Sequence, residues 1–391
     1  MAGFTSMDDF INEVTVNGKF RRADWNKNML PTTVAIAGEW SCLANGGGNP
    51  AAATIYNTGT NLLFQPTYDS TTTAGGIQHG GNVSPDYKSL VGASAYTAAA
   101  TVAPCMMQLV DIIGFYRFTT TTTITSQALT NTLMTFSTVT ATATDTLTLA
   151  SAGSNININL MPYTRVRFTT SGVLPTGLAA ATDYYVIKLT DTTIKVATSY
   201  ANAVAGTAVG ITNGTGSGTN NLQTLLPRYT NGAGVQCFWF ANNATPLGAG
   251  VPNISLSAYT NSAQTASRVT PAVLPIGKTA CPNGQILWTG TGAGKYGPMI
   301  PLQGGDAGIA QVDNAQISAT YTSGECSIVL YVPLATMPVT TLGVASERDF
   351  VNMMPSFPRI YDGANLHWLI GHGAATPTNS AIYGHLDLAW G

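Results

Sequence analysis

The chain has 391 residues, of which 45% are hydrophobic but only 9% are charged, and its formal net charge is −2. Ordinary soluble domains carry about 25% charged residues, so small polar residues must build much of this surface. The composition excludes disorder, because disordered chains are poor in aromatic residues, whereas this one has 16 Tyr, 12 Phe and 6 Trp. It also lacks the excess of basic residues that direct nucleic-acid binding requires.

The scarcity of charge predicts a protein that works in an assembly. Charge repulsion keeps free proteins dispersed. A folded chain with so few ionic groups should therefore have much of its surface covered by other copies or other subunits.

The five cysteines are scattered without a Cys-x-x-Cys pair: Cys42, Cys105, Cys237, Cys281 and Cys326. An odd number at irregular spacing argues against a disulfide framework and a zinc site. We interpret them as buried thiols of a protein made in a reducing cytosol. No apolar run reaches the roughly 18 residues that a membrane span needs, and the first residues lack a signal-peptide pattern, so we expect no membrane association.

Residues 1–29 are predicted to form an N-terminal helix and arm. Ser6 or Thr5 can cap the helix, and Gly18 can end it. Phe10 lies on the apolar face of this helix.

The basic cluster after the helix contains Lys19, Arg21 and Arg22. It is either a solvated turn or a docking arm that meets an acidic patch on a neighbouring subunit. Trp390, one residue from the end, either anchors the C-terminus or fills a neighbour's pocket, since Trp is enriched at interface hot spots. Together with Phe10, these residues are the candidate interface.

Residues 30–132 and 225–391 are predicted to form one discontinuous β domain. Gly, Pro, Asn and Ser make its first part rich in loops, and short strand-like segments follow at 108–118 and after Pro227. Such spacing is typical of an all-β sandwich or jelly roll. One further short helix is expected near the C-terminus, capped by Ser346 and stopped by Pro355.

Residues 133–224 differ from their flanks and predict an inserted Ig-like β-sandwich. The stretch DYYVIKLTDTTIKVATS, residues 183–199, reads as a hairpin that turns at Asp191. Tyr184, Val186 and Lys188 share one face of its first strand. Ile194 and Val196 share a face of the second strand, on the other side of the turn. Insertion at a loop tip is tolerated, because each doubling of loop length costs only about 0.6 kcal/mol.

The inserted segment resembles a β-module that recurs in virion proteins of tailed bacteriophages. Its pattern is Leu-Pro-x-Gly-Leu at 174–178, Tyr-Tyr-Val-Ile at 184–187 and Lys-Val-Ala-Thr at 195–198. The rest of the chain resembles phage structural proteins encoded with the capsid genes. This second resemblance rests on MDDFINEVTVNGKFRRADWNK, ERDFVNMMPSFPRIYDGA and HLDLAWG.

This resemblance implies a virion component, and we expect a capsid cement or decoration protein on the capsid exterior. Its partners would be the major capsid protein and other copies of itself, with weak glycan contact at the host-cell surface through the inserted module. A tail or baseplate component and a carbohydrate-binding adhesin remain the alternatives.

The sequence predicts no enzyme and no catalytic, cofactor or metal site. The glycine-rich WTGTGAGKYGP has one residue too few between Gly290 and Gly294 for a phosphate loop, and Tyr296 replaces the Ser or Thr. We interpret it as a surface turn. His385 and Asp387 lie two apart and would share a strand face, so a pair is conceivable, but packed histidines are the favoured interpretation.

Overall fold

The structure is a computed structural model in which 46% of the residues are in strands and 7% in helices, which confirms the all-β prediction with few short helices. It describes residues 3–29, 37–52, 76–99, 102–118, 124–129, 136–140, 145–149, 160, 162–190, 192–211, 218–241, 247–250, 252–271, 281, 284–286, 298–353, 357–374 and 380–391. The glycine-rich segment around Lys295 lies outside these ranges.

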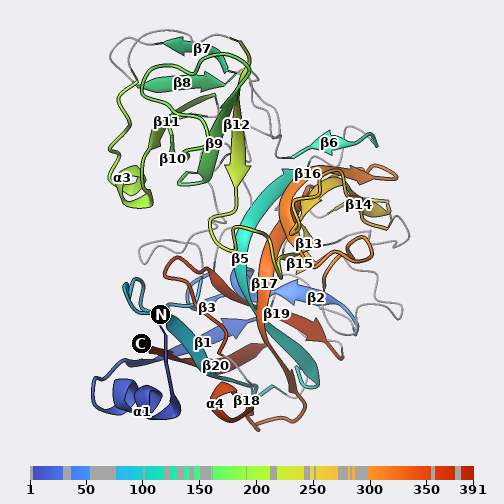
Figure 1. Cartoon of the computed structure of the whole chain (residues 1–391). Helices are drawn as coiled ribbons and strands as arrows, with labels where there is room; N and C mark the ends of the chain where they lie inside the picture. Colours follow the sequence, from blue (N-terminus) through green and yellow to red (C-terminus); the bar gives the residue numbers. More distant parts are fainter. Residues whose placement is uncertain are drawn as a thin grey trace.

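A closed six-stranded barrel forms the centre of the molecule (Figure 1). Its strands, in barrel order, are β13 (Gln236–Ala241), β15 (Gln285–Ile286), β2 (Trp40–Cys42), β19 (Leu366–His372), β5 (Cys105–Phe118) and β17 (Cys326–Val339). The two longest strands, β5 and β17, pair antiparallel along their whole length. Aromatic and aliphatic side chains fill the core on this part of the fold, Trp239 and Tyr331 among them.

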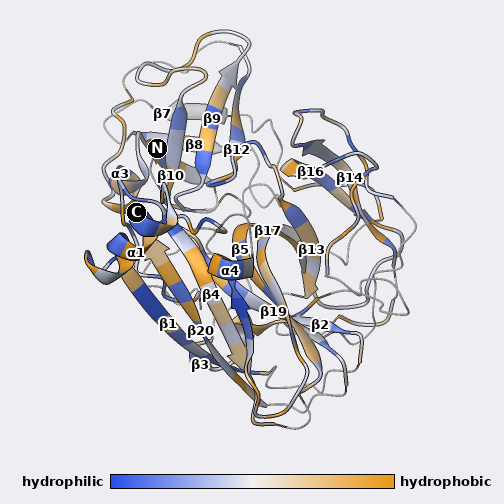
Figure 2. Cartoon of the chain, turned by 60° about the horizontal axis from the view of Figure 1, so that its bottom comes forward, coloured by the Kyte–Doolittle hydropathy of each residue, from blue (hydrophilic) through white to orange (hydrophobic). Residues whose placement is uncertain are grey.

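A five-stranded sheet packs against one side of this barrel (Figure 2). Its order is β18 (Ser346–Asp349), β4 (Lys88–Tyr96), β20 (Ala381–Trp390), β1 (Phe20–Asn28) and β3 (Gly48–Asn49). Trp25 on β1 meets Trp368 on β19 with ring centroids 5.3 Å apart. A third sheet joins β14 (Ile254–Asn261), β16 (Ile309–Ile317) and β6 (Gln127–Ala128).

Two lysines occupy core positions of the five-stranded sheet. Lys27 is 3% exposed, and its Nζ donates to the carbonyls of Gly46 at 3.1 Å and Ala51 at 3.2 Å. Lys88 is 1% exposed, and its Nζ donates to a backbone carbonyl and to His79 Nδ1 at 3.1 Å. Burial lowers the pKa of each lysine to about 8. These contacts satisfy the ammonium groups where the strand pattern calls for apolar residues.

The inserted segment builds a sheet with its own core. The strands are β7 (Phe136–Thr140), β8 (Thr146–Leu149), β9 (Arg165–Thr170), β10 (Asp183–Lys188), β11 (Thr193–Ala197) and β12 (Asn220–Leu225), and helix α3 (Tyr200–Val204) follows β11. The predicted hairpin is confirmed, because Val186 pairs with Val196 and Lys188 with Ile194, although Asp191 lies outside the described residues. The described strands form one six-stranded sheet, which differs from the two-sheet Ig sandwich that we expected.

The N-terminal helix is found as α1 (Met7–Thr15), with Ser6 Oγ accepting from the Asp9 amide at 3.0 Å. The expected arm behind it is corrected, because residues 20–28 are strand β1 in the five-stranded sheet. A free arm would leave its backbone groups to water, whereas β1 satisfies them by pairing with β20 and β3.

The expected late helix begins further along the chain than predicted. Ser346 and Glu347 lie in strand β18, and helix α4 (Phe350–Met353) starts after Asp349. Asp349 Oδ1 accepts from the amides of Val351 at 2.9 Å and Asn352 at 3.2 Å, so Asp349 is the capping residue.

The two chain ends meet, as Figure 1 shows, because the Gly3 amide donates to the Gly391 carbonyl at 2.7 Å. All five cysteines are buried and free of disulfides, which confirms that they are buried thiols. Burial raises the pKa of Cys42 and of Cys105 to about 12. In the part of the chain that the structure describes, no helix combines the length and apolar character needed to cross a membrane.

Candidate functional site

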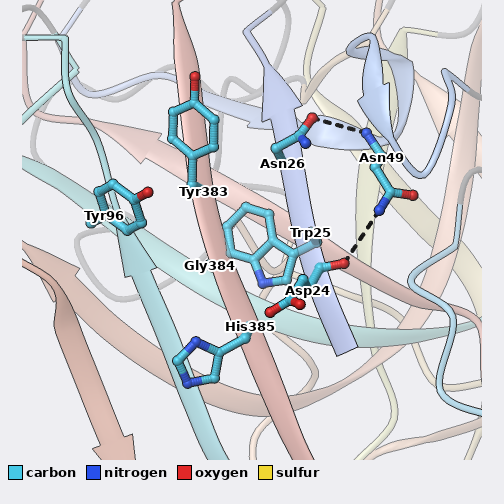
Figure 3. A pocket seen from close by; sticks show the side chains of 8 residues that line it. All are labelled: Asp24, Trp25, Asn26, Asn49, Tyr96, Tyr383, Gly384 and His385. Atoms are coloured by element: carbon cyan, nitrogen blue, oxygen red, sulfur yellow. Dashed lines mark hydrogen bonds between the residues drawn. The ribbon is translucent and has the colours of Figure 1, made fainter. Parts of the chain in front are cut away.

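An open hollow of about 280 Å³ lies on the five-stranded sheet, and we take it as the candidate site (Figure 3). Its lining comes from four neighbouring strands: Asp24, Trp25 and Asn26 of β1, Asn49 of β3, Tyr96 of β4, and Tyr383, Gly384 and His385 of β20.

Strand alternation places these side chains. Successive residues of a strand point to opposite faces. On β1, Ala23, Trp25 and Lys27 are buried toward the barrel, whereas Asp24 is exposed on the other face and Asn26 is half-buried. The register puts Asp24 opposite His385. It also aligns Asn26, Tyr383 and Tyr96 across three adjacent strands.

Tyr96 and Tyr383 form a stacked pair at the hollow. Their ring centroids are 5.4 Å apart, their planes are inclined by 24°, and Tyr96 is 39% exposed. Gly384 lies beside them, and a Cβ there would come within 1.9 Å of the Ser94 carbonyl oxygen and 2.6 Å of the Trp25 ring. Glycine is therefore required for β20 to approach Trp25 and β4 this closely.

Backbone and amide contacts hold the far side of the hollow. The Asn49 amide donates to Asn26 Oδ1 at 3.0 Å, and Asn49 Nδ2 donates to the Asp24 carbonyl at 3.5 Å. These contacts attach the short strand β3 to β1 and orient both asparagine side chains.

An ion pair borders the hollow on the same face. Arg22 donates to the Asp387 carboxylate from Nε at 2.8 Å and from Nη2 at 3.1 Å. His385 Nε2 lies 3.5 Å from Asp387 Oδ2, so the two residues do share a face as their spacing predicted. The Asp387 carboxylate raises the pKa of Arg22 further above its ordinary value.

Of the five predicted interface residues, only Arg22 lies beside this hollow. Phe10 packs on Phe4 and Phe357, with ring centroids 4.9 Å and 5.7 Å away. Lys19 is held between Glu13 at 2.9 Å and Asp86 at 2.8 Å, and these carboxylates raise its pKa. Arg21 and Arg22 are exposed at the start of strand β1 rather than in a turn, and the docking role of the basic cluster stays a prediction.

The two remaining predicted residues lie near the joined chain ends. The Arg21 side chain runs past Gly80. Trp390 is half-buried at the end of β20, and its amide donates to the Lys19 carbonyl at 3.2 Å. This backbone hydrogen bond would form with any residue at position 390, so the two expected roles of the Trp390 side chain stay predictions.

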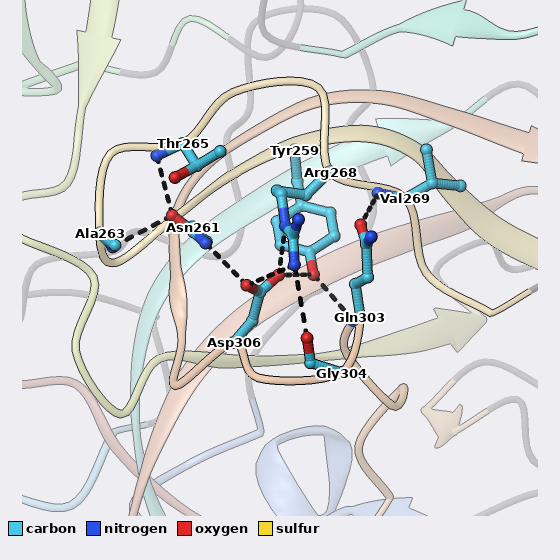
Figure 4. A network of polar contacts seen from close by, with 9 residues as sticks. All are labelled: Tyr259, Asn261, Ala263, Thr265, Arg268, Val269, Gln303, Gly304 and Asp306. Atoms are coloured by element: carbon cyan, nitrogen blue, oxygen red, sulfur yellow. Dashed lines mark hydrogen bonds and ion pairs between the residues drawn. The ribbon is translucent and has the colours of Figure 1, made fainter.

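A second polar cluster serves the fold internally (Figure 4). Asp306 accepts from Tyr259 Oη at 2.5 Å, from Asn261 Nδ2 at 2.7 Å and from both Nε and Nη2 of Arg268, at 3.0 and 2.9 Å. The hydrogen bond from Arg268 is the main reason that the pKa of Asp306 falls to about 2. The cluster ties the loop after β14 to the loop before β16.

The remaining metal-ligating and titratable side chains of the described residues do not form a site. Within those ranges, no three His, Cys, Asp or Glu side chains form a group that could hold a metal ion. His79, His367 and His372 are buried, and burial lowers their pKa values to about 3, 3 and 4. The sequence favoured packed histidines, and the structure confirms this interpretation for these three of the four.

Comparisons with protein-family models, curated proteins and solved structures found no match to this chain.

Proposed function

We propose that this chain is a structural, non-catalytic component of a tailed-phage virion, and more specifically a capsid cement or decoration protein. Its partners would be the major capsid protein and other copies of itself, and its place would be the outside of the capsid. The sequence resemblance suggests the virion, and the surface of the N-terminal region supports the cement role.

The observation that carries the cement role is a run of large apolar side chains left exposed around α1. Met7, Ile11, Val16 and Phe20 are 50%, 49%, 74% and 40% exposed. Met7 and Ile11 are four residues apart on one helix, so they share a face that does not pack on the protein's own core. Large exposed apolar patches mark protein–protein contacts, and a capsid surface is the partner that the resemblance suggests.

The use of the few charges supports the same proposal. Arg228 with Asp111, Arg268 with Asp306, and Lys19 with Glu13 and Asp86 are all paired within the chain. Charges used in this way contribute little repulsion between molecules. Many weak contacts, repeated over a symmetric shell, then add up to a strong attachment.

The position of the inserted module fits a projecting role. Figure 1 places its six-stranded sheet at the opposite end of the molecule from α1 and the chain ends. If α1 faces the capsid, the module points away from it. That arrangement would leave the module available for the weak glycan contact that we expected at the host-cell surface.

Mass spectrometry and labelling of purified virions test this function. We expect many copies of the chain per particle and antibody labelling spread over the capsid. Absence of the chain from virions would refute the virion role. Labelling confined to the tail would refute the cement role and favour the alternative tail or baseplate component.

A charge introduced on α1 tests the docking surface. We expect Ile11→Asp to weaken binding to capsids from a gene-deleted phage by about tenfold or more, because a carboxylate would be desolvated in the contact. The matched control is Val204→Asp on module helix α3, where the valine is 48% exposed. Equal binding by wild type and Ile11→Asp would show that α1 is not part of the interface.

A further inference from the structure

We infer that the outer face of the five-stranded sheet is a binding site for a neutral carbohydrate of one or two sugar rings. Tyr96 and Tyr383 supply the aromatic contact, and Asp24, Asn26 and His385 supply the hydrogen-bonding groups. This inference concerns the predicted host domain rather than the inserted module, and it does not depend on the virion role.

The tyrosine pair provides the apolar half of the site. Sugar rings have one face lined by C–H groups, which packs well on an aromatic surface. The pair stands on adjacent strands with rings nearly parallel, inclined by 24°, and Tyr96 is 39% exposed. Tyr383 is half-buried, so each of the two side chains leaves part of its ring surface on the solvent face of the sheet, where a ligand can contact it.

The polar half of the site surrounds the same hollow. Asp24 carries an exposed carboxylate, an acceptor of hydrogen bonds, and the amide of Asn26 combines an acceptor with two donors. The side chain of His385, 24% exposed, lies opposite Asp24 across the strand pair. Sugar hydroxyls donate and accept at once, so a mixture of this kind matches them.

The charges around the hollow favour a neutral ligand over an anionic one. Arg22, the cation beside it, already donates two hydrogen bonds to Asp387. The exposed Asp24 carboxylate would repel a phosphate or an acidic sugar. A site for such anions would instead present an uncommitted Arg or Lys.

Size and rigidity agree with a small glycan. The volume of about 280 Å³ lies just below the roughly 300–1,000 Å³ of pockets that enclose drug-sized molecules. The lining residues stand on hydrogen-bonded strands, and Asn49 holds Asn26 in place. A preformed site loses little entropy on binding.

The inserted module also has a group of tyrosines, which offers a matched control. Tyr163 and Tyr185 both pack edge-to-face on Tyr200, with ring centroids 5.7 and 6.3 Å away. Tyr185→Ala therefore removes a half-buried tyrosine on β10, a strand of the module sheet, which Figure 1 shows away from strands β1 and β20 of the hollow.

The test uses the full-length protein on an array of neutral oligosaccharides built from glucose, galactose, mannose and N-acetylhexosamines, with acidic glycans beside them. The best neutral ligand is then titrated by calorimetry into the wild type and into Tyr383→Ala, Tyr96→Ala, Tyr383→Phe and Tyr185→Ala. Circular dichroism shows whether each variant is folded.

We expect millimolar or tighter binding of at least one neutral glycan and a loss of about tenfold or more in affinity in Tyr383→Ala and Tyr96→Ala. Tyr383→Phe should keep most of the affinity, since the ring remains, and Tyr185→Ala should match the wild type. The inference is overturned if no neutral glycan binds, if acidic glycans bind best, or if Tyr185→Ala loses binding while Tyr383→Ala retains it.

Discussion

Arg228 and Asp111 form a buried bidentate ion pair that joins the residues after the inserted module to the middle of barrel strand β5. Arg228 Nη2 lies 2.6 Å from Asp111 Oδ1, and Nε lies 2.9 Å from Oδ2. Asp111 also accepts from the Asn365 amide at 2.9 Å, and Arg228 also donates to the Ile112 carbonyl at 2.9 Å. Three segments that are distant in sequence therefore meet at one carboxylate.

Removing one partner of this pair should be costly. We expect Asp111→Asn to lower the free energy of unfolding by about 3–5 kcal/mol, because the Arg228 charge would remain buried without its counter-ion. Urea unfolding followed by tryptophan fluorescence measures the effect. The control is Asp387→Asn, which breaks the more exposed pair with Arg22 and should cost about 1 kcal/mol or less. Equal losses in the two variants would contradict a special role for the buried pair.

Buried histidines should make the protein sensitive to mild acid. The pKa values of His79, His367 and His372 are lowered by burial to about 3, 3 and 4, from an ordinary value near 6.5. Between these values the unfolded chain binds more protons than the folded chain. The stability that these residues contribute is therefore complete above about pH 6.5 and is lost progressively as the pH falls from there to the folded-state pKa values.

The expected slope is about 1.4 kcal/mol per pH unit for each histidine, so all three together would give about 4 kcal/mol per unit. Urea unfolding at intervals from pH 7 to pH 4.5 measures it. His372→Gln should remove about a third of the slope, whereas Tyr185→Phe, which adds no group that titrates in this range, should leave it unchanged. A stability that is constant from pH 7 to pH 4.5 would contradict the prediction.

Local patterns in the sequence were sufficient to predict elements whose residue spacing or capping involves only neighbouring residues. The 183–199 hairpin was predicted with its faces, because alternation of Tyr184, Val186, Ile194 and Val196 needs only neighbouring residues. The shared face of His385 and Asp387 followed from the same period of two. Serine capping of α1 is equally local.

The sequence did not predict the candidate site, because buried lysines interrupt the apolar–polar alternation of the strands that carry it. In β1, the inward positions are Ala23, Trp25 and Lys27, so a buried lysine stands where an apolar residue would have completed the alternation. Lys88 does the same at the start of β4. The backbone carbonyls that accept hydrogen bonds from these buried lysines are brought close only by the fold. The local sequence therefore does not predict them.

Long-range pairing was likewise beyond the sequence. Nothing near Arg228 identifies Asp111 as its partner, since 117 residues separate them. The meeting of Tyr96 with Tyr383 depends on the β4–β20 register, which is set by the whole sheet. The alternation of apolar and polar residues also does not show which strands pair. It therefore could not distinguish one six-stranded sheet in the module from a two-sheet sandwich.

The Asp306 cluster should keep its two loops together as the pH is lowered, until the Asp306 carboxylate is protonated in strong acid. The pKa of Asp306, about 2, lies below the ordinary value of 3.8, mainly because Arg268 donates to the carboxylate. The ionised carboxylate therefore stabilises the folded state above about pH 4, and this contribution disappears as the pH falls through 2. Asp306→Asn should remove the contribution at every pH.

Hydrogen exchange at the Gln303 amide reports on this cluster, since that amide donates to Tyr259 Oη at 2.9 Å. We expect roughly tenfold faster exchange in Asp306→Asn than in the wild type at pH 5, after correction for intrinsic rates. The Val186 amide, bonded to the Thr164 carbonyl in the module, is the internal control. Unchanged exchange at Gln303 would show that the loops are held without the carboxylate.

The inserted module should be removable without unfolding the rest of the chain. Both of its connections are held on strand β16: β6, before the module, pairs with Asn314 and Ala315, and Gln223, near the module's end, donates to Gln311 Oε1 at 3.1 Å. Three residues of strand span roughly 10 Å, so a short linker can bridge the gap. The module also has a core of its own, separate from the barrel core.

We therefore expect a variant with residues 133–224 replaced by about six Gly and Ser residues to unfold cooperatively, within about 1.5 kcal/mol of the full chain. Tryptophan fluorescence measures the remaining fold selectively, because all six tryptophans lie outside the module: Trp25, Trp40, Trp239, Trp288, Trp368 and Trp390. The fluorescence transition should have nearly the same midpoint in both proteins. A shortened chain without a cooperative transition would mean that the barrel needs the module to fold, and the description of residues 133–224 as an insertion would be wrong.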